Sequence, residues 1–220
     1  MCGRFALTIV HGFFARFAVK EYAIELFPRY NIAPTQDVPI VIRESPNRAV
    51  MMRWGLIPFW AKDPKIGNRL INARAETLAT KPAFRVSLKR KRCLVPATGF
   101  YEWKRTDEGK EPYYVRLKDG AYFSFAGLYD KWIDPKTGKE TPTFTIVTTI
   151  PNGLMATIHN RMPVMLREDD ESEWLSHEPL PEDDLKRLFK PFTAQSMEAY
   201  RVSTDVNSPA NDHPRLIEPM

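Results

Sequence analysis

The sequence predicts an α+β protein, a curled mixed β-sheet or open barrel with helices at its periphery. Three observations indicate this class. Segments rich in Val, Tyr, Phe and Trp follow one another through the middle of the 220-residue chain, separated by turn residues. Helical patterns are confined to the flanks, and 19 prolines interrupt the chain often enough to favour short segments. We find no internal repeat, flexible linker or domain boundary, so we expect a single domain over residues 1–220.

Each element is predicted from its own pattern. Aromatic residues recur loosely at helical spacing over residues 12–27, which predicts one or two helices there. Pro82 suits a first helical position, so a helix is expected from there into the basic run that follows it. Two late helices are expected at residues 168–175 and 181–189. The expected strands are 38–43 and 49–54, joined by a turn at Ser45-Pro46-Asn47, and then 92–96, 99–104, 112–117, 121–132 and 142–148.

Charge is distributed unevenly along the chain. Residues 167–185 hold nine acidic side chains and one basic one, so the remainder carries +13 within a net charge of +5. A basic body attracts polyanions, of which nucleic acid is the commonest in cells. On charge pattern alone, a solvated helix face is the commoner explanation for the densest basic run. That run consists of Arg85, Lys89, Arg90, Lys91 and Arg92.

Composition excludes several classes of protein. No apolar run approaches the length of a membrane-spanning helix, about 20 residues, and charged residues interrupt the N-terminal apolar stretch that a secretory signal would need. Cys2 and Cys93 are the only cysteines, too few for a disulfide framework or for a zinc site alone. We therefore expect a cytoplasmic protein with no metal ion and no cofactor, and Cys93 as an inert residue of the core.

Cys2 is the first candidate for chemistry. The initiator methionine is normally removed before a small second residue, and removal of Met1 would leave Cys2 with a thiol and a free α-amine. Reference pKa values of about 8.5 and about 7.7–8.0 make both groups partly nucleophilic near neutral pH. Such an aminothiol condenses with an aldehyde to an imine and then closes a thiazolidine ring. On position alone, a cysteine that happens to be second is the commoner explanation.

Five further motifs place a few polar side chains among apolar residues and prolines, a context that often marks a site. They are RYNIAPTQ (29–36), RWGLIPFWAKD (53–63), INARAET (71–77), CLVPATGFYEWK (93–104) and IHNRMPVML (158–166). With the opening MCGRF, the sequence resembles the SRAP family, the SOS response-associated peptidases, also described as abasic-site processing proteins. The resemblance covers nearly the whole chain, with the motifs in the family's order and spacing, and it implies the SRAP-like fold.

The resemblance implies a reaction with an abasic site in DNA, whose open sugar is an aldehyde. Cys2 would form a stable thiazolidine crosslink with it and so shield the lesion. Glu102, whose aromatic neighbours would raise its pKa, is the expected acid–base group. His159 is suited to proton transfer, and the match places it at a lyase or crosslink-reversal step. Asn72 is expected to hydrogen-bond the sugar or the Cys2 amine. Without the match, Glu102 could equally be an outward-facing strand carboxylate and His159 a structural residue.

The expected partner is single-stranded DNA, at the nucleoid, with no membrane and no obligate protein partner. Arginine suits phosphate because its guanidinium gives bidentate contacts. Aromatic side chains can stack on bases, at about 1–3 kcal/mol per base. Trp54 is expected instead in the core. The side chains expected on the DNA are Arg4, Pro34, Phe59, Trp60, Arg74, Arg85, Trp103 and Arg161.

Three other functions remain open at this stage. N-terminal-nucleophile amidotransferases also open with Met-Cys-Gly, but they need a glutamine-binding motif and usually a second domain, and we find neither. A thiol peptidase could use Cys2 with Glu102 and His159, and self-cleavage after Met1 would be one instance of it. A single-strand binder without catalysis would use only the basic body and the aromatic residues.

Overall fold

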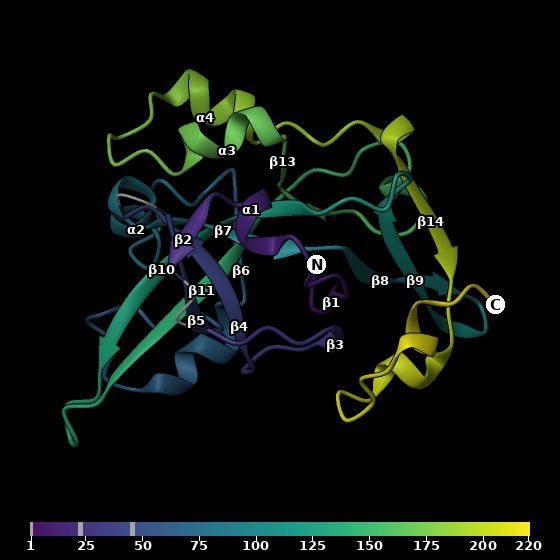
Figure 1. Ribbon diagram of the computed structural model, residues 1–220, viewed down its shortest axis with the longest axis horizontal. Helices are drawn as coiled ribbons and strands as arrows, with labels where there is room; N and C mark the ends of the chain where they lie inside the picture. Colours follow the sequence, from purple (N-terminus) through teal and green to yellow (C-terminus); the bar gives the residue numbers. More distant parts are fainter. Residues whose placement is uncertain (1, 22–23, 45–46) are drawn as a thin grey trace.

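The computed structural model describes residues 2–21, 24–44 and 47–220, in which two β-sheets carry helices on their outside (Figure 1). The described α-helices are α1 (Phe13–Arg16), α2 (Arg85–Arg90), α3 (Glu168–Trp174) and α4 (Glu182–Leu188). The described strands are β1 (Phe5–Leu7), β2 (Val19–Glu21), β3 (Arg29–Ile32), β4 (Asp37–Ile42), β5 (Asn47–Trp54), β6 (Asn72–Arg74), β7 (Arg92–Ala97), β8 (Gly99–Thr106), β9 (Gly109–Leu117), β10 (Phe123–Ile133), β11 (Glu140–Thr149), β12 (Met162–Pro163), β13 (Met165–Leu166) and β14 (Met197–Arg201).

The larger sheet curls into a closed barrel. Its strand order among the described residues is β12-β11-β10-β7-β4-β5-β2, and β5 also pairs in parallel with β11, which brings the curled sheet back on itself. At this closure Trp54 is fully buried, lies parallel to Phe144 with 6.3 Å between ring centroids, and meets Phe5 edge-on at 5.2 Å. The α+β class, the curled barrel and the core position of Trp54 are thus confirmed.

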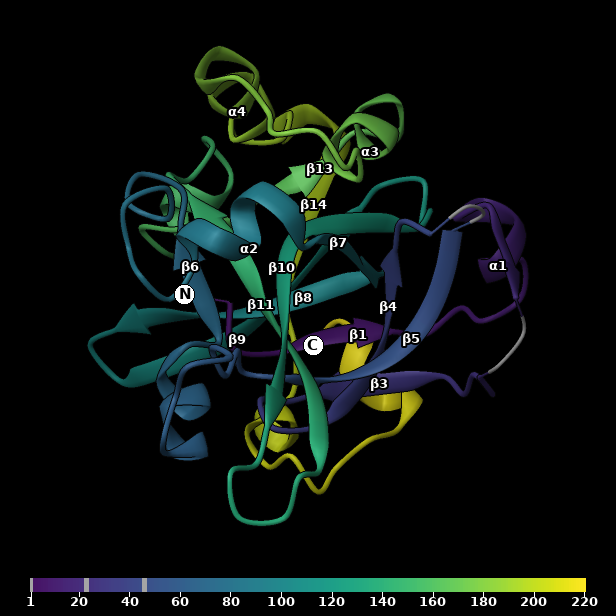
Figure 2. The ribbon, with the colours of Figure 1, turned by 90° about the vertical axis from the view of Figure 1, so that its left-hand side faces the viewer.

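The smaller sheet has the order β14-β9-β8-β1-β3 among the described residues. Its short strand β1 lies between β3 and β8, with Phe5 opposite Ile32 on one side and Phe100 on the other (Figure 2). All three residues of β1 are buried, and Phe5 also contacts Phe125 of the barrel edge-on at 5.9 Å. The two sheets therefore share one core, and β1 carries the start of the chain into its centre.

The strands expected from the sequence between residues 38 and 148 are confirmed as β4, β5 and β7 to β11, and the late helices as α3 and α4. The helix expected near Pro82 is α2, which begins three residues later, at Arg85. Cys93 is fully buried, as expected, and burial raises the pKa of its thiol well above the ordinary value. No described helix is long and apolar enough to cross a membrane.

One or two helices are expected over residues 12–27, and the described residues of this range have one, the single turn of α1, followed by a strand where more helix was predicted. α1 ends at Arg16, Ala18 has a positive φ of 49°, and β2 then pairs in parallel with β5. The aromatic spacing has another cause, because Phe13 and Phe17 both pack against Tyr122 in the core. Tertiary packing thus overrides a weak helical pattern. Tyr22, one of the aromatic residues in the predicted helical pattern, and Ser45 and Pro46 of the predicted turn lie outside the described residues.

Arg92 of the basic run is a structural brace. It is only 4% exposed, and its guanidinium donates to main-chain carbonyl groups at the ends of two helices. Nε donates to Trp174 O at 2.7 Å and Nη1 to Leu88 O at 2.8 Å, while Nη2 donates to the carbonyl groups of Ser176 and Glu178. A cation among the last carbonyls of helices is favourable. Arg92 is therefore not available to DNA.

Arg92→Met should lower the free energy of unfolding by about 3 kcal/mol or more, because each buried carbonyl left without a donor costs about 1–3 kcal/mol. Urea denaturation measures the change. The matched control is Arg90→Met, which removes the same charge from an exposed position of α2. Equal urea midpoints for the two variants would show that the hydrogen bonds of Arg92 contribute nothing to the free energy of unfolding.

Candidate active site

The first residues of the chain extend the pairing of β1 with β8. Tyr101 N donates to Arg4 O at 2.9 Å, so the segment before β1 runs beside the part of β8 that carries Glu102. Cys2 is fully buried there, with its Sγ 3.9 Å from Arg4 O. Local sheet pairing therefore fixes the backbone next to the candidate nucleophile.

Asn72 holds the Cys2 backbone from the other sheet. It lies on β6, which pairs in parallel with β11, with Asn72 opposite Ile146. Its Nδ2 donates to Cys2 O at 2.7 Å. Its Oδ1 is buried and accepts no hydrogen bond from any residue that the structure describes. Asn72 thus fixes the Cys2 carbonyl group and keeps an acceptor available beside it, for the Cys2 amine or a sugar hydroxyl.

Glu102 provides the carboxyl group of the site. It is 2% exposed, on β8, and burial raises its pKa. The pKa of the Cys2 thiol is raised as well, first by burial and then by the charge of nearby Glu102. A raised carboxyl pKa suits an acid–base group, and a raised thiol pKa means that the thiol needs a base to react. The predicted pair of Cys2 and Glu102 is therefore brought together in the structure.

His159 follows a short 3₁₀ helix (Met155–Thr157) and has a defined tautomer. Its Nδ1 accepts a hydrogen bond from Arg161 N at 3.1 Å, so the neutral ring carries its proton on Nε2. Partial burial lowers the His159 pKa, which favours this neutral form. His159 and Trp103 line one cavity of about 390 Å³ together with Lys104 and Arg105. The imidazole thus lies at a basic cavity next to the strand that carries Glu102.

Arg74 and Arg161, both expected on phosphates, meet at β11. Arg74 pairs in register with Thr148, and Arg161 Nη2 donates to Thr148 O at 2.7 Å. Arg74 is exposed, whereas the Arg161 side chain is 13% exposed and is bound bidentately by Glu76, at 2.5 and 3.0 Å. The two arginines therefore flank the same end of β11. Arg161 is paired with a carboxylate, whereas Arg74 is exposed.

Arg74→Ala should weaken single-strand binding and reduce the slope of log affinity against log salt by about 0.7, the value of one phosphate contact on single strands. Binding titrations at several salt concentrations give the slope. Arg187→Ala is the control, because it also removes one arginine but from the acidic helix α4. If both variants shift the slope equally, Arg74 acts only through net charge.

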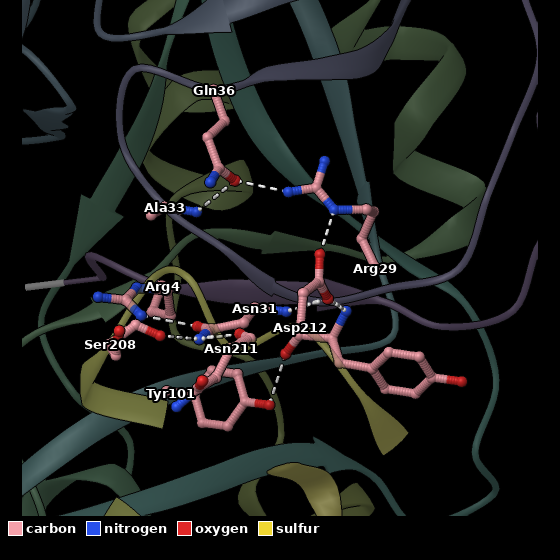
Figure 3. A network of polar contacts seen from close by, with 10 residues as sticks. Arg4, Arg29, Asn31, Ala33, Gln36, Tyr101, Ser208, Asn211 and Asp212 are labelled. Atoms are coloured by element: carbon pink, nitrogen blue, oxygen red, sulfur yellow. Dashed lines mark hydrogen bonds and ion pairs between the residues drawn. The ribbon is translucent and has the colours of Figure 1, made fainter. Parts of the chain in front are cut away.

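Arg4 is anchored inside the protein. Its Nη1 donates to Asn31 Oδ1 at 2.7 Å (Figure 3). The same Nη1 also donates to Val206 O at 2.6 Å, and burial lowers the pKa of Arg4. Asn31 Nδ2 in turn donates to the carbonyl groups of Val206, Ser208 and Asn211, at 3.2, 3.0 and 2.7 Å. The C-terminal segment therefore wraps the residue next to Cys2-Gly3. A phosphate contact by Arg4 stays a prediction, and these internal partners indicate a positioning role.

The aromatic residues expected to stack on bases, and Pro34, which is expected on the DNA, lie in three separate segments. Phe59 and Trp60 are 56% and 46% exposed, in a loop that is fixed from beneath because buried Asp130 accepts a hydrogen bond from Phe59 N at 2.9 Å. Trp103 is partly exposed, and its Nε1 donates to Asn207 Oδ1 at 2.8 Å. Pro34 is partly exposed in the β3–β4 loop. Their contacts with DNA stay predictions.

Arg85 lies apart from these residues. It lines a different cavity of about 520 Å³, whose wall is mainly apolar and includes Leu88, Leu180 and Phe189. Glu76 lines the same cavity, and its carboxylate is also the partner of Arg161. Arg85 therefore shares a cavity with Glu76, the partner of Arg161, and does not line the cavity of His159 and Trp103. Among the described residues, no group of His, Cys, Asp and Glu could hold a metal ion.

Sequence reasoning missed Glu76, Thr148 and Asn31. Glu76 is in the INARAET motif, but only the pairing of β6 with β11 shows that it meets Arg161. Asn31 is fully buried in the RYNIAPTQ motif, and a buried amide needs partners. The motif could therefore have indicated that Asn31 is buried and hydrogen-bonded. It could not have indicated that its hydrogen-bond partners come from residues 206–211.

The chain is similar over most or all of its length to known proteins. The family model described as SOS response associated peptidase (SRAP) matches residues 1–209. Abasic site processing protein YoqW of Bacillus subtilis (strain 168) is 49% identical over 229 residues, covering 99% of each chain. Abasic site processing protein HMCES of Gallus gallus is 33% identical over 225 residues, covering 88% of this chain and 66% of that one. A crystal structure of a protein from Bacteroides thetaiotaomicron has a TM-score of 0.89 at 32% identity, with both chains fully covered.

Proposed function

Because the chain belongs to the SOS response associated peptidase (SRAP) family, we propose that it processes abasic sites in DNA by bonding to them through Cys2. The lesion is supported by the names of bacterial and animal relatives, which are abasic site processing proteins. The chemistry is supported above all by the convergence on Cys2, whose carbonyl group is held by Asn72 and whose thiol lies near buried Glu102. Removal of Met1, which lies outside the described residues, is the required first step because it frees the Cys2 amine.

The proposed reaction joins both nucleophiles of Cys2 to one carbon atom. The amine attacks the aldehyde carbon of the open sugar, and loss of water gives an imine. The sulfur then adds to the same carbon, the thiol proton goes through the site to the nitrogen, and the five-membered thiazolidine closes. The net change is loss of one water molecule, so no oxidant or reductant is needed.

Glu102 is the proton carrier in this proposal. Burial raises its pKa, so it keeps a proton to higher pH than an exposed carboxyl group and can protonate the sugar oxygen as the ring opens. As the carboxylate it then accepts the thiol proton, which Cys2 holds firmly because its own pKa is raised. The buried Oδ1 of Asn72 is available to the amine or a sugar hydroxyl. One carboxyl group thus serves as acid first and base afterwards.

His159 supports a separate, lyase-type step. Its neutral ring presents Nε2–H as a donor, because Nδ1 is occupied by Arg161 N. A donor at this position can protonate a leaving oxygen or the sulfur once the imine exists. We therefore assign His159 to strand cleavage at the lesion and to reversal of the adduct.

A second candidate activity is removal of Met1 by the protein itself. The family name includes peptidase, and the Cys2 thiol lies next to the bond that would be cut, near Glu102. Synthesis in a cell-free system with a methionine aminopeptidase inhibitor tests this, with the intact mass as the readout. Retention of Met1 under these conditions assigns its removal to an outside enzyme.

The main test exposes Met1-free protein to a single-stranded oligonucleotide with one abasic site and to the same strand without it. The expected result is an adduct that survives heat and denaturant and forms only with the lesion. A catalytically inert binder would give no such adduct, and an amidotransferase would instead release ammonia from glutamine. Duplex DNA with the same lesion should react less, because the stacking side chains Phe59 and Trp60 need unpaired bases.

A further inference from the structure

Arg161 has a restricted choice of partners. An arginine offers five N–H donors, and a bidentate acceptor needs two neighbouring ones on one edge. At the outer edge, Nη1 and Nη2 donate to the two carboxylate oxygens of Glu76 at 2.5 and 3.0 Å. On the other edge, Nη2 donates to Thr148 O at 2.7 Å, and Nε is buried with no acceptor among the described residues. A phosphate can therefore engage Arg161 bidentately only where Glu76 now lies.

The two partners of Arg161 differ in accessibility. The Arg161 side chain is 13% exposed and is held from within by Thr148, whereas the Glu76 side chain is 47% exposed. The carboxylate can thus leave while the guanidinium stays in place. Arg161 N also holds the His159 ring, which further fixes this backbone.

A displaced Glu76 would find other cations nearby. Its pKa is held below the ordinary value first by the hydrogen bond from Arg161 and also by the charge of Arg74. Glu76 further lines the cavity of about 520 Å³ with Arg85 and Lys89, which are both exposed. The carboxylate can therefore exchange Arg161 for neighbouring basic groups without being left alone.

We propose that Glu76 is an internal competitor for DNA, whose carboxylate occupies the phosphate position on Arg161 until a strand phosphate displaces it. The proposal rests on the proposed function, and it adds a residue that lowers affinity for undamaged strands. Binding of any strand must first break the Arg161–Glu76 pair. Covalent capture at an abasic site makes the exchange lasting, whereas an undamaged strand is released again. Glu76 thereby favours reaction with the lesion over retention of intact DNA.

Glu76→Gln tests the proposal, because it keeps the shape and one acceptor but removes the charge. The expected result is about fivefold tighter binding of an undamaged single strand, the upper range for a partly exposed ion pair. The matched control is Glu198→Gln, which breaks another partly exposed arginine–glutamate pair, between Glu198 on the edge strand β14 and Arg116 on β9. The gain should disappear when Glu76→Gln is combined with Arg161→Ala, because no cation is then released.

Crosslinking of an abasic strand separates this proposal from the proposed function. For Glu76→Gln, the half-saturating DNA concentration should fall while the rate at saturating DNA stays unchanged. If Glu76 only positions Arg161, its substitution should instead weaken DNA binding and slow the reaction, because His159 is then misplaced. That result would overturn the proposal. Binding equal to that of Glu198→Gln would overturn it too. Failure of the wild-type protein to crosslink would instead reject the proposed function, while the binding comparison would still decide the role of Glu76.

Discussion

We expect Cys2→Ser to abolish the heat-stable adduct with an abasic strand and to leave the affinity for a single strand within about twofold of the wild-type value. Oxygen closes the five-membered ring far less favourably than sulfur, so the reaction stops at a reversible imine. Binding is spared because the side chains expected on DNA lie elsewhere, and because Ser fits the buried space that Cys2 occupies. Adduct formation is measured on denaturing gels after heating, and binding by fluorescence anisotropy.

The control for this variant is Cys93→Ser, which places the same change in the core of β7. It should lower stability and leave crosslinking intact. A reductant that traps imines should still capture the Cys2→Ser protein on the abasic strand, since its α-amine remains. A heat-stable adduct from Cys2→Ser without reductant would contradict the thiazolidine mechanism.

Glu102→Gln should slow crosslinking by about 10²–10⁴, the usual contribution of a general acid–base group. The amide keeps the shape and one acceptor at this buried position but can neither donate a carboxyl proton nor take the thiol proton. Since burial raises the Glu102 pKa, the wild-type rate should fall as pH rises through that raised pKa and the acid form is lost. The Glu102→Gln rate should lack this limb of the pH profile.

His159→Ala is the informative comparison for Glu102→Gln. It should spare formation of the crosslink and reduce strand cleavage and release of the adduct, because both need a proton moved after the imine exists. Time courses of all three processes at several pH values measure this division. Equal slowing of all three by both substitutions would contradict it, and wild-type crosslinking by Glu102→Gln would remove Glu102 from the mechanism.

Local patterns were enough for most of the long strands of both sheets. The strands from β7 to β11 alternate with clear turn residues, so their approximate positions follow from the sequence. The short strands β1, β3 and β6 were not foreseen, because three or four residues carry too little pattern. They exist because their neighbours supply the pairing. Of the helical prediction over residues 12–27 only the turn of α1 is found among the described residues, since tertiary contacts of Phe13 and Phe17 determine that segment.

For the candidate site, the reactive residues could be predicted from the sequence, but the interactions of the arginines could not. The identities of Cys2, Asn72 and Glu102 were available from the motifs, and the structure adds the hydrogen bond and burial that relate them. The states of the arginines were not available. Arg4, Arg92 and Arg161 look alike in a sequence, yet one is wrapped by the C-terminal segment, one caps helix ends and one is paired with Glu76.

The position of β1 between β3 and β8 has a consequence for how the protein matures. Cys2 becomes buried only when β8 is in place, and β8 begins at Gly99. During synthesis at about 5–20 residues per second, the ribosome needs roughly 5–20 s to reach that strand. Once the start of the nascent chain has left the ribosome, Cys2 stays unburied for the rest of this interval. If an outside aminopeptidase removes Met1, slow translation lengthens the time in which it can act before Cys2 is buried.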